Sequence, residues 1–132
     1  MTIILASSNA GKLREFKDFL KDFEVRNYSE FIAPFEIEEN GADFKENALI
    51  KARAVYKALK SQNPEALKNA IILSDDSGIS VKALDGAPGI YSARYSSDLV
   101  EHPTEVSNRA KLKSELDKKG VFSSPAFYTA AI

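Results

Sequence analysis

The chain has 132 residues, with 18 Lys and Arg against 19 Asp and Glu, a net charge of −1 and no cysteine. This length predicts a single domain over 1–132. Because the charges are balanced, the protein has no overall positive electrostatic field that would attract nucleic acid or an anionic membrane. We therefore expect neither as a partner. The lack of cysteine excludes disulfides, thiolate nucleophiles and cysteine-based zinc sites. Because its start carries neither a membrane-spanning run nor a signal peptide, we expect a soluble, cytoplasmic protein.

Predicted strands and helices alternate through the N-terminal half of the chain. A β-rich run at 2–7 is followed by a helical pattern of apolar residues that begins at Gly11. The segment "FEIEENGADF" (35–44) predicts a short strand and then a turn. Asp43, with a glutamate three residues on, is predicted to cap a helix that runs to about Lys60.

The C-terminal half predicts three further strands and one helix. Two runs, 70–73 and 79–84, predict strands that pair as a hairpin around an acidic turn. A Gly/Pro loop at 85–95 precedes a predicted helix at 104–120, and the residues 126–132 predict an apolar strand. The alternation indicates an α/β fold with a mixed, twisted sheet and flanking helices.

The loop "ASSNAGKL" (6–13) lies between the first strand and the first helix. It is not a P-loop, because Ala6 stands where the first glycine belongs and Leu13 stands where the magnesium-binding Ser/Thr belongs. Free N–H groups at the start of the helix nevertheless favour an anion. The alternative is that Ser and Asn side chains only cap a surface helix.

The segment "SDDSGIS" (74–80) puts two adjacent acids after a predicted strand. On an extended chain Asp75 and Asp76 point to opposite faces, so one of them is expected to be the principal group of a site. Glu36 and Glu38 share a face in the second predicted strand. Carboxylates from two strand ends can hold one Mg²⁺, which needs one or two of them beside water and phosphate. The alternative is turn chemistry with solvated glutamates.

Three longer segments occur in the order "ASSNAGKLREF", "EENGADFKENALIKA" and "SDDSGISVKALDGAPGIYSARY". Together they resemble the inosine triphosphate pyrophosphatase (Ham1-like) family, and the resemblance covers positions 3 to about 95. It implies a two-lobed α/β fold with a central cleft and a homodimer at full length. The implied activity is Mg²⁺-dependent hydrolysis of dITP, ITP and XTP to the monophosphate and pyrophosphate, which removes non-canonical purine nucleotides from the pool.

The resemblance also assigns roles to single residues of this chain. Asp76 matches the family's general base, and with Glu38 it matches the ligands of Mg²⁺. Asp75 is then a supporting acid. The residues that match substrate contacts are Ser7, Asn9, Lys12, Asn47, Lys51 and Ser77. The i, i+4 spacing independently puts Asn47 and Lys51 on one helix face.

Other aromatic and basic residues have simpler interpretations. His102, the only histidine, stands beside a proline and is expected in a surface loop. For Tyr91 and Tyr95 core packing is favoured over framing a base. Arg94 suits an internal ion pair as well as a phosphate contact.

Two downstream segments of the family, a "GFGYDP"-type loop and a "SHR"-type motif, do not occur in this chain, which stops at Ile132 within the last predicted strand. We therefore expect a chain truncated at its C-terminal end, with base selectivity inferred from the family alone. An uncovered edge strand predicts self-association, and a cleft without its base-binding wall predicts little activity for these 132 residues. A pyrimidine-directed pyrophosphatase of the septum-formation-inhibitor type and a non-catalytic nucleotide-binding fragment remain as alternatives.

Overall fold

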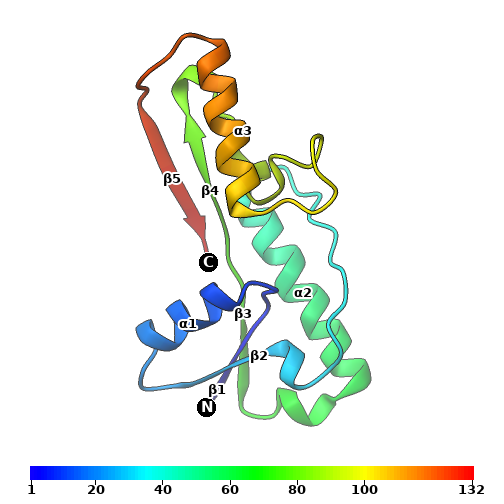
Figure 1. Ribbon diagram of the computed structural model, residues 1–132. Coiled ribbons are helices and arrows are strands. Elements are labelled where there is room, and N and C mark those ends of the chain that lie inside the picture. Colours follow the sequence, from blue (N-terminus) through cyan, green and yellow to red (C-terminus); the bar gives the residue numbers. More distant parts are fainter. The chain divides into compact units, whose positions relative to one another are not determined.

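The computed structural model describes residues 1–132, and their contacts separate two compact units (Figure 1). Unit 1 comprises Met1–Asp75 and Ile132, and unit 2 comprises Asp76–Ala131. The boundary therefore falls between two adjacent acids. The expectation that residues 1–132 form a single domain stays a prediction. None of the helices combines the length and the apolar character that crossing a membrane requires.

Unit 1 is built on a three-stranded parallel sheet. Its elements in chain order are β1 (Thr2–Leu5), α1 (Ala10–Phe19), β2 (Glu24–Asn27), α2 (Phe44–Gln62) and β3 (Ala70–Leu73). The central strand β1 pairs with β2 and β3, and Thr2 is in register with both Glu24 and Ala70. Parallel neighbours need crossover connections, which contain α1 and α2 here. The carboxyl ends of all three strands meet at one edge, which is where ligands bind in open α/β sheets.

The strand prediction for 35–44 was wrong, and β2 was missed. Residues 33–43 form neither helix nor strand. Their backbone instead bonds to side chains of α2, since the N–H of Gly41 donates to Asn47 Oδ1 and the N–H of Ala42 donates to Glu46 Oε2. The true strand, "EVRN", contains one apolar residue, Val25, and therefore gives almost no hydrophobic signal.

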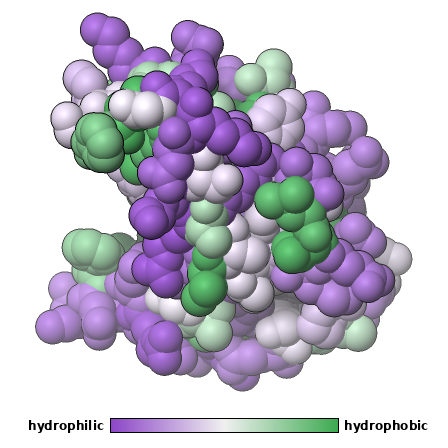
Figure 2. Space-filling view, turned by 45° about the horizontal axis from the view of Figure 1, so that its top comes forward, coloured by the Kyte–Doolittle hydropathy of each residue, from purple (hydrophilic) through white to green (hydrophobic).

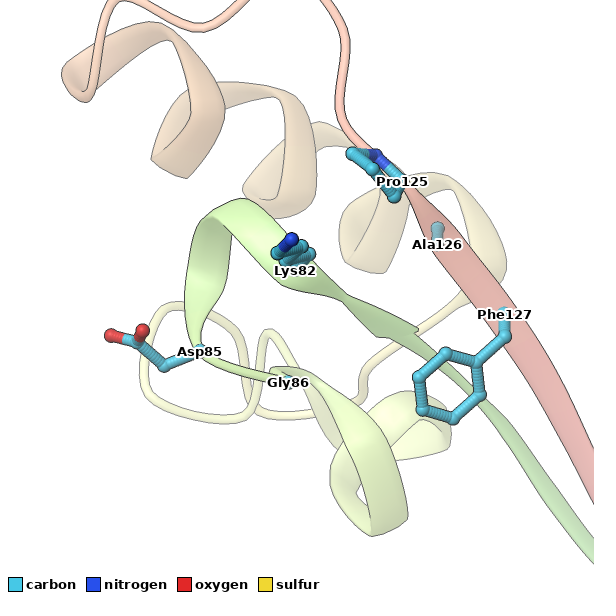
Figure 3. A pocket seen from close by; sticks show the side chains of 6 residues that line it. All are labelled: Lys82, Asp85, Gly86, Pro125, Ala126 and Phe127. Atoms are coloured by element: carbon cyan, nitrogen blue, oxygen red, sulfur yellow. The ribbon is translucent and has the colours of Figure 1, made fainter.

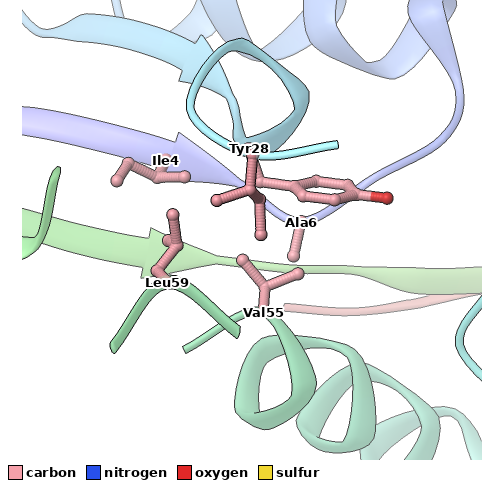
Figure 4. Close-up of a cluster of buried hydrophobic side chains, with 6 residues drawn as sticks. Ile4, Ala6, Tyr28, Val55 and Leu59 are labelled. Carbon is pink, nitrogen blue, oxygen red and sulfur yellow. The ribbon is translucent and has the colours of Figure 1, made fainter. Parts of the chain in front are cut away.

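The core of unit 1 lies between β1 and α2 (Figure 4). Val55 and Leu59, one helical turn apart, are completely buried and belong to the same cluster as Ile4 of β1. Tyr28 closes this cluster after β2. The helix predicted after Asp43 is thus confirmed, with Val55 and Leu59 among its buried residues. Full burial of a Val or Leu side chain contributes about 1.5–3 kcal/mol, so this contact anchors the helix to the sheet.

Unit 2 pairs two strands that are far apart in sequence. Its main elements are β4 (Asp76–Val81), α3 (Glu105–Lys118) and β5 (Ala126–Ala131). β4 pairs antiparallel with β5, from Asp76 opposite Ala131 to Val81 opposite Ala126. The predicted hairpin between 70–73 and 79–84 was therefore wrong, because β3 pairs with β1 in another sheet. Periodicity indicates which residues form a strand, but it does not identify the partner strand.

The strand β5 is apolar in sequence but not buried. Phe127 and Tyr128 are largely exposed, as are Phe122 before the strand and Ile132 after it. The face drawn in Figure 2 is mainly hydrophilic and is interrupted by separate apolar patches. The prediction of an uncovered strand at this end is confirmed for the side chains of β5, while self-association stays a prediction.

Contacts with a lysine of α3 order the loop between β4 and α3. Lys111 donates to the Tyr95 carbonyl and to Asp98 Oδ1, both at 2.9 Å. The hydrogen bond from Lys111 lowers the pKa of the exposed Asp98 below its ordinary value, against a smaller opposing effect of desolvation. His102 is exposed, which confirms the prediction of a surface loop. The Arg94 guanidinium carbon lies over the Tyr91 ring, 5.2 Å from its centroid. Tyr91 is 56% exposed, so the core-packing prediction was wrong for this residue.

Gly78 allows the loop to pack directly on β4. The 3₁₀ helix Gly89–Arg94 lies so close that a Cβ atom at Gly78 would overlap the Gly89 carbonyl oxygen and the Ser92 side chain. Ser92 Oγ also accepts a hydrogen bond of 3.0 Å from the N–H of Ile79. Glycine at this position is therefore a steric requirement of the segment that carries Asp76.

We expect Gly78→Ala to lower the free energy of unfolding by about 2 kcal/mol, because a methyl group in a closely packed contact with backbone forces the elements apart. Urea unfolding followed by circular dichroism measures the change. The control is Gly120→Asn, since Gly120 has open space and a φ of 65°, which Asn tolerates. Equal stability of Gly78→Ala and the parent chain would contradict the steric argument.

Candidate functional site

The loop after β1 is ordered by its own side chains. The ladder between β1 and β3 continues with the N–H of Ala6 donating to the Leu73 carbonyl at 2.8 Å. The N–H of Asn9 donates to Ser7 Oγ at 3.0 Å. Asn9 Oδ1 in turn accepts from the N–H groups of Gly11 and Lys12, at 2.8 and 3.3 Å. The capping interpretation of this loop is thus confirmed, and phosphate binding by Ser7 and Asn9 stays a prediction.

Asn27 is a residue of this site that sequence reasoning missed. It ends β2, and its buried Nδ2 donates to the Ser7 carbonyl at 2.7 Å, which attaches the loop to the second strand. Asn27 also caps the following turn, where Glu30 Oε2 accepts from the Asn27 N–H at 2.9 Å. The spacing Asn-x-x-Glu is a capping-box signal, so the position could have been found from the sequence.

An ion pair joins the first and third predicted segments. Lys12 Nζ lies 2.7 Å from Asp75 Oδ2, although 63 positions separate the two residues in the chain. Lys12 is in the first turn of α1 and Asp75 is the second residue after β3, so the pair lies at the carboxyl edge of the sheet. The side chains are 23% and 9% exposed, respectively. Asp75 Oδ1 is buried and has no hydrogen-bond partner.

Side chains of α2 bind the segment before the helix, which includes Glu38. Glu39 Oε1 lies 3.2 Å from Lys51 Nζ, and the N–H of Gly41 donates to Asn47 Oδ1 at 2.8 Å. Asn47 is only 1% exposed, and its Nδ2 is buried without a hydrogen-bond partner. Glu38 itself is exposed. The helix therefore presents Asn47 and Lys51 as supports of this loop, and their predicted substrate contacts stay predictions.

The Asp43 cap of α2 is confirmed, since Asp43 Oδ1 accepts from the Glu46 N–H at 2.8 Å. Ser74 Oγ donates to the Ala48 carbonyl, which ties the end of β3 to the same helix. Hydrogen bonds and ion pairs thus connect the ends of β1 and β3 with the N-terminal turns of α1 and α2. Unit 1 contains six of the eight residues predicted for the site. Ser7, Asn9 and Lys12 lie in the loop after β1 and the first turn of α1, Asn47 and Lys51 lie on α2, and Glu38 lies in the segment before α2.

Asp76 and Ser77 begin β4 in unit 2 and were expected to lie in a turn. Because they are consecutive residues of a strand, their side chains point to opposite faces. Ser77 Oγ lies 2.9 Å from the Tyr128 hydroxyl of β5. Asp76 follows Asp75 directly in the chain, at the boundary between the two units.

Glu38 and Asp76, the residues predicted to bind metal, belong to unit 1 and unit 2, respectively. No three or more His, Asp or Glu side chains of this chain come together as a metal site. Mg²⁺ needs only one or two carboxylates and takes its other oxygens from water and phosphate, so a nucleotide would supply the remaining ligands. The exposed carboxylate of Glu38 and the carboxylate of Asp76 are hard oxygen donors that suit this ion.

A hollow of about 440 Å³ opens elsewhere, in unit 2 (Figure 3). It contains no residue predicted for the site. Lys82 and Asp85 supply its charged groups, and Phe127 of β5 forms an apolar wall. The residues that line it are Lys82, Asp85, Gly86, Pro125, Ala126 and Phe127.

The fold and site define an α/β protein whose charged and polar residues gather at the carboxyl edge of a parallel sheet. The Ham1 family matches residues 3–132, and the chain belongs to this family. The resemblance derived from the sequence is therefore confirmed.

Known proteins of the family resemble the chain along its whole length. It is 58% identical to a dITP/XTP pyrophosphatase of Campylobacter hominis, covering 100% of this chain and 63% of that protein. A dITP/XTP pyrophosphatase of Campylobacter jejuni is 55% identical, with coverage of 100% and 62%. The Staphylococcus aureus Ham1 structure superposes with a TM-score of 0.67 at 32% identity, covering 99% of this chain and 70% of that one. The chain thus spans less than two thirds of the length of these two curated relatives.

Proposed function

We propose that the protein hydrolyses dITP, ITP and XTP to the nucleoside monophosphate and pyrophosphate with Mg²⁺, and thereby removes these nucleotides from the cellular pool. The observation that carries the proposal is the Lys12–Asp75 ion pair, which connects the predicted phosphate loop to the predicted acidic segment. The 58% identity to a protein named dITP/XTP pyrophosphatase supports the substrate class. The proposal includes a cytoplasmic homodimer at full length, with neither nucleic acid nor membrane as a partner.

The residue types suit attack of water on a phosphorus that is already surrounded by negative oxygens. Lys12 and the positive end of the α1 macrodipole offset the charge of the phosphates. Asp76 orients the attacking water and accepts its proton. Glu38 and Asp76 would hold Mg²⁺, which supplies charge neutralisation along the triphosphate. The remaining substrate contacts are Ser7, Asn9, Asn47, Lys51 and Ser77. No residue of the chain forms a covalent intermediate in this mechanism.

The test is release of pyrophosphate from dITP, ITP and XTP, with ATP and dUTP as comparison substrates. It is run on the 132-residue chain and on a hybrid protein, in which these residues replace the matching part of the Campylobacter jejuni relative. The unaltered relative is the positive control. We expect the hybrid to release pyrophosphate from the three purine nucleotides with Mg²⁺, and to stop when EDTA removes the metal.

Other outcomes contradict the proposal in recognisable ways. Faster hydrolysis of dUTP than of dITP by the hybrid would indicate the related pyrimidine-directed class. Saturable binding of ITP without any pyrophosphate release would indicate a non-catalytic nucleotide-binding protein. Both comparisons use the same protein preparation, so differences in folding do not affect the interpretation.

A further inference from the structure

Lys12 stands at a position where its charge is unfavourable for the helix. It lies in the first turn of α1, where the macrodipole presents its positive end, and no acidic residue of that turn compensates for it. A lysine side chain also has four flexible carbons and many rotamers. Without an external anchor, its ammonium group would be poorly placed to bind a particular phosphate oxygen.

Asp75 provides that anchor from a rigid part of the fold. Its neighbours on the chain are fixed, since Leu73 accepts a backbone hydrogen bond from Ala6 and Ser74 donates to the Ala48 carbonyl. The Asp75 carboxylate therefore occupies a defined position 2.7 Å from Lys12 Nζ. An ammonium group has three N–H donors, and this contact uses one of them, which leaves two for a ligand.

The burial of Asp75 argues against direct contact with a ligand. Its side chain is 9% exposed, and Oδ1 is inaccessible to solvent and has no hydrogen-bond partner. A phosphate would also be repelled by the carboxylate. Lys12 is more accessible, at 23%, so it is the member of the pair that a solvent-borne anion reaches.

We propose that Asp75 is a positioning residue that acts on phosphate only through Lys12, whose ammonium group it holds at the N-terminus of α1. This inference deepens the proposed function, because it rests on Lys12 as a phosphate contact. It separates the roles of the two adjacent acids. Asp75 orders the cation that binds the phosphates, whereas Asp76 is the acid proposed to act on water.

The test compares Asp75→Asn with Asp75→Ala in the 132-residue chain. Both variants remove the negative charge, but only Asn keeps an oxygen that can accept from Lys12. The probe is inorganic tripolyphosphate without divalent cation, with affinity measured by isothermal titration. We expect Asp75→Asn to bind the probe about threefold to tenfold more tightly than Asp75→Ala, which corresponds to the cost of ordering one long side chain on binding. In a Lys12→Met background the difference between the two variants should vanish.

Matched controls and a second measurement make the result decisive. Asp18→Asn and Asp18→Ala alter an exposed acid of the same helix and should leave the affinity for tripolyphosphate within about twofold. Nitrogen-15 relaxation of the Lys12 ammonium should show restricted motion in the parent chain. Equal affinities of the two Asp75 variants, a difference that persists without Lys12, or a mobile Lys12 ammonium in the parent chain would each overturn the inference. The relaxation measurement needs no substitution, so it decides the question even where Asp75→Ala does not fold.

The inference and the proposed function fail differently. Ordered binding of tripolyphosphate with no hydrolysis of dITP by the hybrid protein would contradict the function and leave the role of Asp75 intact. Hydrolysis of dITP together with equal affinities of the two Asp75 variants would contradict the role of Asp75 alone.

Discussion

Asp76→Asn is expected to lower the turnover of dITP by the hybrid protein about a thousandfold, which is within the range for loss of a general base. The amide keeps the shape of the side chain but loses the negative charge for Mg²⁺ and the basicity needed to accept a proton from water. The fold should persist, because Asp76 starts the strand β4 through its backbone, in register with Ala131. Pyrophosphate release under saturating dITP measures the effect.

The matched control for this variant is Asp117→Asn, an acid-to-amide change at an exposed position of α3. Its turnover should stay within about twofold of the parent hybrid, as is usual for a surface charge. Circular dichroism and urea unfolding verify that both variants are folded. If Asp76→Asn hydrolyses dITP near the parent rate, Asp76 is not the base, and the assignment of the acidic segment is wrong.

Lys12→Met is expected to weaken binding of tripolyphosphate by a factor of about 10 to 150, because a charge-assisted contact contributes about 1.5–3 kcal/mol. The same change leaves the Asp75 carboxylate, which is 9% exposed, without its partner. We therefore also expect a loss of about 2 kcal/mol in the free energy of unfolding, since a buried group left unsatisfied bears its desolvation cost. Isothermal titration and urea unfolding measure the two effects.

Lys17→Met is the control for this prediction, because Lys17 is an exposed lysine of the same helix. It should change neither property appreciably. The stability loss should also disappear when Lys12→Met is combined with Asp75→Asn, since the uncompensated carboxylate is then removed. Unchanged affinity for tripolyphosphate in Lys12→Met would leave the loop after β1 as a helix cap alone.

Local patterns were sufficient to find much of the candidate site. Asp43 was predicted to cap its helix, and capping by Ser or Asn was one interpretation of the loop after the first strand. Asp43 and Asn9 both accept hydrogen bonds from N–H groups two or three residues ahead. Such caps depend on residues close together in the chain, so their spacing is visible in the sequence. The run "AIIL" likewise forms β3, because its apolar residues need no distant information to favour a strand.

Contacts between segments that are far apart in the chain could not be predicted from such local spacings. The sequence suggested that Asp75 supports the site, but it did not indicate that Lys12 is its partner. The strand β2 was not predicted because its only buried residues are Val25 and Asn27, and one of these two is polar. Asn27 satisfies its polar groups through contacts that include the Ser7 carbonyl, 20 positions away in the chain.

The sequence by itself determined the family, the order of the polar segments and the helix caps, because these depend on residue types at short spacings. Only the tertiary structure decided that β4 pairs with β5, that Gly78 must lack a side chain, and that Asp75 binds Lys12. Strand pairing and ion pairing depend on which segments the fold brings together. The alternation of apolar and polar residues in a strand specifies which face is buried, but it does not specify the neighbouring strand. In the same way, the presence of a charged residue does not specify its counter-ion.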